Sequence, residues 1–270
     1  MMNEKVAELI VFFNQFEEFC IAVSGGIDSM LLAYIANRFS SAEVKIVHAF
    51  SPAVPQAALD RVKAHAQAYQ WDLEVIDANE FDDVNYINNP VNRCYFCKSN
   101  LYTRVAEHGN GIIFSGTNVD DLGDVRPGLT AATEQNVLHP YVEVGINKKE
   151  IYEIAAFYGL TELSALPSQP CLASRVETGI KIKPDDMKFI DSVEEKVRHF
   201  LPTFKNIRCR ISQQGIFVEL DRMPEKVPLE LLSYNLSEYC ANQGRIFSGM
   251  KVYQKGSAFL NGLNHGATNG

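Results

Sequence analysis

Residues 21–29 read I-A-V-S-G-G-I-D-S: a short apolar run, a Ser-Gly-Gly turn, and then the helix-forming stretch M-L-L-A-Y-I-A-N-R. Adjacent glycines allow backbone conformations that other residues avoid and let N–H groups approach an anion closely. Ser24 and Ser29 add hydroxyl groups, and the next helix directs its unpaired N–H groups and positive dipole end to the same place. The stretch therefore predicts a strand, a phosphate-binding turn (the SGG turn, residues 24–26) and a helix.

Two common nucleotide-binding loops are absent from the sequence. It contains no G-x-x-x-x-G-K followed by Ser or Thr, and no G-x-G-x-x-G that opens a helix. The pattern S-G-G-x-D-S instead resembles the PP-loop of ATP pyrophosphatases, which split ATP between the α and β phosphates and hold pyrophosphate in this turn. The alternative is a plain glycine turn between a strand and a helix. Asp28 has two interpretations, a ligand of Mg2+ near the phosphates or a helix cap.

Strand and helix patterns alternate through the first half of the chain, with strands expected at residues 20–24, 44–50, 73–76 and 112–115. This predicts an α/β fold, a doubly wound parallel sheet with ligands at the carboxyl ends of its strands. The PP-loop resemblance implies the adenine nucleotide alpha hydrolase-like version of that fold. After a proline-containing loop, shorter strands and helices predict a second, smaller α+β domain. We expect a PP-loop ATP pyrophosphatase domain with a cysteine site over residues 1–177 and the small domain over residues 178–270.

Composition and charge restrict the class of protein. The chain has 270 residues, 46% of them hydrophobic, and a net charge of −8. It has no apolar run of bilayer length, and from its acidic, amphipathic first ten residues we expect no secretory signal. A negative net charge disfavours a large nucleic-acid interface, which needs a basic surface. We therefore expect a cytoplasmic protein that acts on a small molecule, has no membrane partner and is disfavoured, though not excluded, as a nucleic-acid binder. We also expect a homo-oligomer.

Three of the six cysteines follow apolar patterns. Cys20 lies in the first expected strand, Cys209 alternates with two arginines, and Cys240 continues a helical stripe. We expect all three to pack in hydrophobic cores.

The other three cysteines occur in polar contexts, Cys94 and Cys97 in N-R-C-Y-F-C-K and Cys171 in P-C-L-A-S-R. The C-x-x-C spacing fits a redox dithiol, half of a zinc site, part of an iron–sulfur site or a pair of core cysteines. Zinc would need a fourth ligand, for which His108 is the nearby candidate. Three thiolates suit a 4Fe-4S cluster with one open iron, and catalysis by Cys171 without a cluster is a further alternative.

Five motifs, S-G-G-I-D-S, N-R-C-Y-F-C-K, G-T-N-V-D-D-L-G-D-V-R-P-G-L, P-C-L-A-S-R and R-C-R, together resemble the LarE-type sulfur transferases of nickel-pincer cofactor biosynthesis. The resemblance implies an ATP-dependent sulfurtransferase that forms AMP and pyrophosphate. With ATP and Mg2+ it would adenylate a carboxylate of a pyridinium mononucleotide and replace AMP with sulfur. One branch of the family sacrifices the sulfur of a cysteine matching Cys171. The other carries cysteines matching Cys94, Cys97 and Cys171 and is associated with a 4Fe-4S cluster, and this chain resembles that branch.

The same resemblance assigns the site residues. It implies catalytic roles for Cys171, Asp28, Ser174 and Arg175; nucleotide or phosphate binding by Ser24, Gly25, Gly26, Asp28, Ser29, Asp121, Asp124, Arg126, Arg208 and Arg210; and metal binding by Cys94, Cys97, Cys171 and Glu194. Structural alternatives are turn chemistry for residues 121–126, a solvated strand face for the two later arginines and a solvated helix face for Glu194.

Two departures from the family pattern concern the substrate. Gln254 and Lys255 stand where the family has an aromatic-Arg-Ser-Gly stretch, and Leu138-His139-Pro140 replaces a small polar strand start. An arginine binds phosphate through two hydrogen bonds and a lysine does not. These departures therefore leave the identity of the carboxylate that accepts sulfur undetermined. Other functions left open are tRNA thiolation, a non-catalytic adenine-nucleotide scaffold and, more weakly, an amide ligase.

Overall fold

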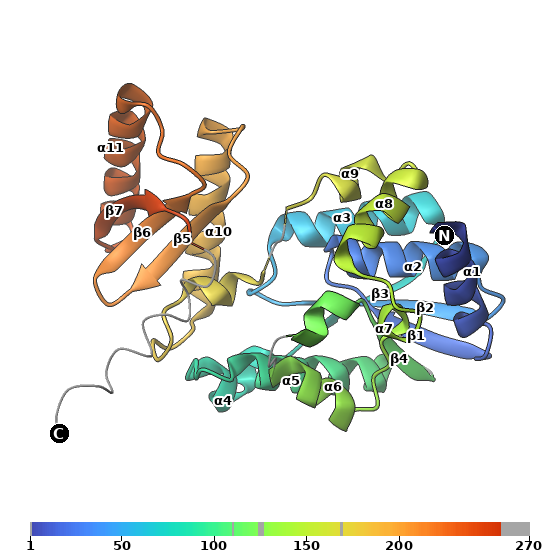
Figure 1. Cartoon of the computed structure of the whole chain (residues 1–270). Helices are drawn as coiled ribbons and strands as arrows, with labels where there is room; N and C mark the ends of the chain where they lie inside the picture. The colour runs from blue at the N-terminus through green and yellow to red at the C-terminus, as the bar shows by residue number, and fades with distance from the viewer. Residues whose placement is uncertain (1, 110, 124–126, 168–169, 255–270) are drawn as a thin grey trace, which may run out of the picture. The chain divides into compact units, whose positions relative to one another are not determined.

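The apolar run before the SGG turn forms an inner strand of a parallel sheet in the computed structural model (Figure 1). β1 (Glu18–Ala22) pairs in parallel with β2 (Glu43–Phe50) and with β4 (Ile112–Ser115), while β3 (Asp72–Asp77) pairs in parallel with β2. The strand order is β3-β2-β1-β4. The predicted α/β fold with a parallel sheet is confirmed. The structure describes residues 2–109, 111–123, 127–167 and 170–254.

Successive strand residues point to opposite faces of this sheet, and each face carries its own hydrophobic core. Phe19 and Ile21 of β1 pack with α1, α2 and α3, whereas Cys20 of β1 and Val47 of β2 pack with α5 and α6 (Figure 1). Burial on both faces explains why the strands read as nearly continuous apolar runs. The helices and 3-10 turns of this unit are α1 (Met2–Phe13), α2 (Ile27–Phe39), α3 (Gln56–Tyr69), η1 (Glu80–Asp82), α5 (Arg93–His108), η2 (Val119–Gly123), α6 (Pro127–Glu134), α7 (Pro140–Glu143), α8 (Lys148–Phe157) and α9 (Thr161–Ser164).

A second unit holds a mixed sheet in the order β5-β6-β7. β5 (Ile207–Ser212) is antiparallel to β6 (Gly215–Leu220), and β6 is parallel to β7 (Phe247–Val252). This agrees with the expected small α+β domain. Nowhere in the described ranges does a helix have the length and apolar character needed to span a bilayer. The helical elements of this unit are α4 (Val84–Ile87), η3 (Leu172–Arg175), α10 (Pro184–Phe200) and α11 (Lys226–Asn242).

The division between the units differs from the boundary expected at residue 178. The larger unit comprises Met1–Asp83 and Asn92–Gln169, and the smaller comprises Val84–Val91 and Pro170–Gly270. Residues 170–177 join the smaller unit through contacts such as the bridge between Val176 and Ile211. Residues 84–91 join it because the Asn89 side chain donates to backbone carbonyls of residues 177 and 180, at 2.9 Å each. Neither contact has a local sequence signal, since each joins residues far apart in the chain.

Candidate functional site

The two glycines of the SGG turn have different structural roles. Gly25 has a φ of +78°, and a Cβ atom built on it would lie 2.9 Å from both Cβ and O of Ala58 on α3. A side chain at this position would therefore strain the backbone and collide with α3. Gly26 is in an extended conformation with a φ of −83°, which any residue adopts, so the expected unusual backbone applies to Gly25 and not to Gly26.

The two serines brace the turn. The Ser29 hydroxyl accepts a hydrogen bond from the Ser24 N–H at 3.0 Å, and the two hydroxyl oxygens lie 3.2 Å apart. Ser29 is buried, whereas Ser24 is exposed. Ser29 therefore stabilises the turn from inside, and the exposed Ser24 accepts a hydrogen bond from the Gly26 N–H at 3.3 Å.

Arg61, a buried residue that the sequence analysis did not identify, forms a hydrogen bond with the backbone of the SGG turn. Arg61 of α3 donates from Nη1 to the carbonyl oxygen of Gly25 at 2.6 Å and is 8% exposed. Its Nε has no hydrogen-bond partner among the described residues, and the nearest carboxylate is that of the exposed Glu162, 3.9 Å away. Burial lowers the pKa of Arg61 from its ordinary value. A positive charge with weak compensation thus lies directly behind the SGG turn.

Replacing Arg61 with glutamine is expected to weaken the binding of pyrophosphate about tenfold, because a charge-assisted hydrogen bond and a nearby positive charge are lost. Isothermal titration calorimetry with inorganic pyrophosphate measures the effect. The control is Lys63→Gln, which removes a charge from an exposed position of the same helix. Unchanged pyrophosphate affinity in R61Q, with only a lower melting temperature, would limit Arg61 to a structural role.

Asp28 forms an ion pair that the sequence did not predict. Nζ of Lys148, the first residue of α8, lies 2.7 Å and 2.5 Å from the two carboxylate oxygens of Asp28. Asn118 donates to the same carboxylate at 3.4 Å, and the Tyr141 hydroxyl donates to the Asp28 carbonyl at 3.1 Å. Asp28 lies within the first turn of α2, whose N-cap is Gly26. The capping interpretation therefore does not describe its side chain, which holds Lys148.

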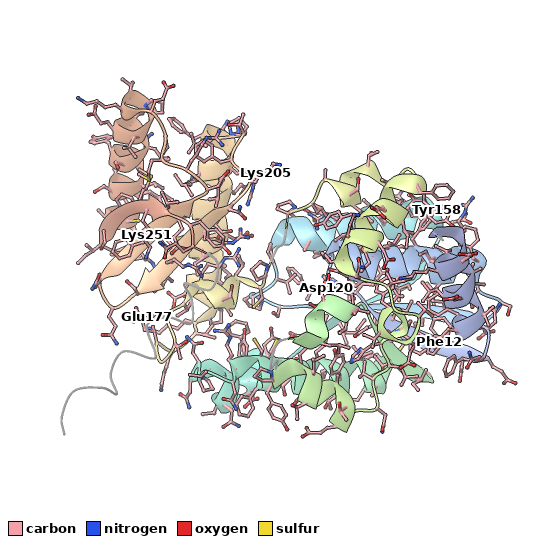
Figure 2. All side chains as sticks on the ribbon, in the orientation of Figure 1. Phe12, Asp120, Tyr158, Glu177, Lys205 and Lys251 are labelled. Atoms are coloured by element: carbon pink, nitrogen blue, oxygen red, sulfur yellow. The ribbon has the colours of Figure 1, made fainter. Side chains whose placement is uncertain are left out.

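Asn118 links Asp28 to Asp121 and so extends the site along η2. The Asn118 side chain donates to Asp121 at 2.9 Å, and the amide of Lys148 donates to the carboxylate of Asp120 at 3.0 Å. Asp120 is labelled in Figure 2. The structure therefore links the sequence-predicted Asp121 to Asp28 through the Asn118 side chain. The sequence-predicted Asp124 and Arg126, and Lys255, lie outside the described residues.

Cys94 and Cys97 lie one helical turn apart in the first turns of α5. Cys94 is exposed and Cys97 is half-buried, so the interpretation as a core cysteine pair is wrong. His108 ends the same helix, eleven residues beyond Cys97, which places it about 16 Å away along the helix axis. That separation excludes His108 as the fourth ligand of a zinc ion held by both cysteines.

The remaining cysteines divide as predicted. Cys20, Cys209 and Cys240 are fully buried, which confirms them as core residues. Burial raises the pKa of Cys20 to about 11 and that of Cys209 well above its usual range, so both stay protonated thiols. All six cysteines lie in the described ranges, and none forms a disulfide.

Cys171 of the smaller unit is the N-cap of the 3-10 turn η3, and the residues after it hold this turn. The Ser174 hydroxyl donates to the Cys171 carbonyl at 2.8 Å, and Arg175 Nη1 donates to that carbonyl at 3.0 Å. Arg175 Nε donates to a carboxylate oxygen of Glu194 at 2.8 Å, and that oxygen also accepts from the Cys209 amide at 3.0 Å. The solvated-face alternative for Glu194 is wrong, because the residue is buried. In this structure Glu194 anchors Arg175, and its metal role stays a prediction.

Arg208 and Arg210 flank Cys209 on β5, and Arg208 is buried rather than solvated. Burial, followed by the charge of Arg175, lowers the pKa of Arg208 to about 10. Arg210 donates to Glu219 and to the Ser174 carbonyl, both at 2.8 Å. Arg175 and Arg210 thus hold carbonyl groups of the Cys171 turn, and Arg208 lies within electrostatic range of Arg175.

The structure therefore assembles the predicted site in two parts. The SGG turn, Asp28, Ser29 and Asp121 belong to the larger unit, where Cys94 and Cys97 also lie, whereas Cys171, Arg175, Arg208 and Arg210 belong to the smaller unit. No group of three or more His, Cys, Asp or Glu side chains placed to hold a metal ion is found in the described ranges. The three-thiol ligand set stays a prediction. Sequence reasoning missed Lys148, whose signal is a lysine at the start of a helix, where the helix dipole disfavours positive charge.

Comparison with known proteins gives two relatives of similar length and one distant relative. The uncharacterized protein slr1717 of Synechocystis is 33% identical over 242 residues, which cover 88% of each chain. The uncharacterized protein MJ0830 of Methanocaldococcus jannaschii is 30% identical over 231 residues, 82% of this chain and 88% of that protein. Pyridinium-3,5-bisthiocarboxylic acid mononucleotide synthase of Lactiplantibacillus plantarum is 24% identical over 221 residues, 80% of this chain and 79% of that protein. No family model matches the chain.

Proposed function

We propose a function from the premise that this chain belongs to the family of slr1717 and MJ0830 and is a distant homologue of the L. plantarum synthase. It is an ATP-dependent sulfur transferase that converts carboxylates of a pyridinium mononucleotide into thiocarboxylates, as a step of nickel-pincer cofactor biosynthesis. The observation that carries the proposal is the charge arrangement at the SGG turn. Lys148 and Arg61 bring positive charge to a glycine turn at the carboxyl edge of a parallel sheet, where such sheets bind ligands.

The first step activates the carboxylate, which resists attack by sulfur because it is anionic and lacks a good leaving group. A carboxylate oxygen attacks the α-phosphorus of ATP, the bond to the bridging oxygen breaks, and pyrophosphate leaves. Negative charge builds on the departing pyrophosphate, where the N–H groups of the SGG turn and Lys148 stabilise it. Mg2+, when bound, would supply further positive charge on the phosphates. Asp28 is its candidate ligand, although Lys148 contacts both of the Asp28 carboxylate oxygens here.

The second step transfers sulfur to the acyl-adenylate. The donor set of three thiols outside the cores suits a 4Fe-4S cluster. Cys94, Cys97 and Cys171 would hold this group, which when bound would supply an iron with an open position for sulfide. Ser174 and Arg175 fix the Cys171 turn through its carbonyl, so they set the direction of that thiol.

The arginines of the smaller unit suit a phosphorylated substrate. Arg175 pairs with the buried carboxylate of Glu194, and Arg210 pairs with that of Glu219. Arg208 is buried beside them on β5. A guanidinium group can bind a phosphate through two parallel hydrogen bonds, so these arginines are candidate ligands of a substrate phosphate. The phosphate of a pyridinium mononucleotide has the required charge and chemistry.

The proposal is tested with protein purified without oxygen and supplied with Mg2+, ATP, sulfide and pyridinium-3,5-biscarboxylic acid mononucleotide. We expect release of AMP and pyrophosphate, and a mass increase of the acceptor that corresponds to replacement of oxygen by sulfur. ATP binding without pyrophosphate release for any pyridine carboxylate tested would favour a non-catalytic scaffold. A salt-dependent gel shift with tRNA, followed by thiolation of the tRNA, would favour tRNA as the acceptor.

A further inference from the structure

His139 forms a hydrogen-bonded pair with Ser115 that the reaction described so far does not use. His139 precedes α7, and its Nδ1 lies 2.8 Å from the hydroxyl of Ser115, the last residue of β4. The Ser115 hydroxyl lies 3.0 Å from that of Thr117. Ser115 is buried and His139 is half-buried, and no described residue hydrogen-bonds the Nε2 atom of His139. One nitrogen of the ring is thus fixed and the other is available.

This pair lies beside the start of α2, where the proposed phosphate site is. A Cβ built on Gly116, the residue after Ser115, would lie 2.6 Å from the Ser29 nitrogen and 2.9 Å from the Asp28 carbonyl carbon. The segment that carries the Ser115 hydroxyl is therefore packed directly against the residues that follow the SGG turn.

The charges around the imidazole come from three elements. They are Lys98 on α5, Asp121 on η2 and Glu143 on α7. Burial first, and then the charge of Lys98, lower the pKa of His139 from its ordinary value of 6.5, while the two acids oppose this. The imidazole is therefore neutral at physiological pH. Lys98 directly follows Cys97, so the ring lies within electrostatic range of the helix that carries Cys94 and Cys97.

We propose that His139 is a catalytic base for the second step, in which its Nε2 accepts the proton of the attacking sulfur. The inference rests on the proposed function. With inorganic hydrosulfide as donor, a lone pair on sulfur forms the new C–S bond at the acyl carbon. The proton moves to Nε2, and the electrons of the S–H bond stay on sulfur. The C–O bond to the adenylate breaks, and AMP leaves with that electron pair. No oxidant or reductant is required, and the imidazolium returns its proton to solvent.

The first step needs no such base, because the carboxylate that attacks ATP is already ionised. The two steps should therefore respond differently to loss of the imidazole. His139→Asn suits the test because the asparagine amide takes the place of Nδ1 toward Ser115 and removes Nε2. His199→Asn, at an exposed position in the last turn of α10, is the matched control.

In a single-turnover experiment with sulfide, H139N is expected to form thiocarboxylate about 100-fold more slowly, while pyrophosphate release slows far less. The ionisation of sulfide affects the rates of both proteins equally, so it cancels in the ratio of the wild-type rate to the H139N rate. It should shrink as the pH falls through the pKa of His139, below 6.5, because a protonated ring cannot accept a proton. NMR of the imidazole nitrogens, assigned by comparison with H139N, should show a neutral ring at neutral pH.

Equal losses in both steps, or a ring that is protonated at neutral pH, would overturn the assignment of His139 as the base. Wild-type protein that releases no pyrophosphate contradicts the proposed function instead. In that case the NMR measurement, which needs neither ATP nor acceptor, still decides whether the imidazole has the neutral form that the inference requires.

Discussion

Replacing Asp28 with asparagine is expected to lower the rate of pyrophosphate release by about 100-fold, the scale on which enzymes lose rate when a group that organises transition-state charge is removed. The substitution preserves size and removes the charge that holds Lys148 at the SGG turn. The measurement is pyrophosphate release at saturating ATP. Asp60→Asn, on the exposed face of α3, is the control. A wild-type rate in D28N would remove the main support for the site.

Lys148→Met separates the two roles open to Asp28. If Asp28 acts only by positioning Lys148, the double variant should lose no more activity than either single variant, because the two residues act as one unit. If Asp28 also binds Mg2+, D28N alone should raise the Mg2+ concentration needed for the half-maximal rate. The Mg2+ dependence of K148M then serves as the internal control, since Lys148 is a cation and cannot bind the metal.

The sheet was predictable from the sequence because its information is local. Each strand is a short apolar run buried on both faces, and the turn residues mark the ends, so β4 was predicted with its observed bounds. The unit boundary was not predictable in this way. Asn89 joins the smaller unit through side-chain hydrogen bonds to carbonyls about 90 residues later in the chain, and no periodicity encodes such contacts.

The site shows the same division between local and distant information. The SGG turn and its serines form one continuous motif. In the structure the buried Ser29 hydroxyl accepts a hydrogen bond from the Ser24 N–H, and Ser24 is exposed. Lys148 and Arg61 reach the turn from helices 120 and 36 residues away, so only folding reveals them. Lys148 is the first residue of α8, where the helix dipole disfavours a positive charge. A lysine at such a position is a signal in the sequence that the side chain has a specific partner.

The cysteines give the prediction with the most visible outcome. Protein purified without oxygen and reconstituted with iron and sulfide is expected to be brown, and Cys94→Ala is expected to abolish the visible absorption together with bound iron and sulfide. The reason is that a 4Fe-4S cluster held by three protein thiolates has no spare ligand. Cys240→Ala is the matched control, because that thiol is buried in the smaller unit and burial raises its pKa, which keeps it protonated.

Colourless wild-type protein after reconstitution would remove the cluster and leave catalysis by Cys171 alone as the surviving interpretation. Catalysis by Cys171 alone can be recognised from the protein itself. A cysteine that gives up its sulfur supports one turnover, and the mass of the protein falls by the mass of that sulfur. C94A would then keep full single-turnover activity, while Cys171→Ala would have none. If the cluster exists, C94A and C171A should instead fail together, since each removes one of the three thiolates. The comparison of these two variants therefore decides whether the thiols of Cys94 and Cys97 on α5 and the thiol of Cys171 act as one ligand set.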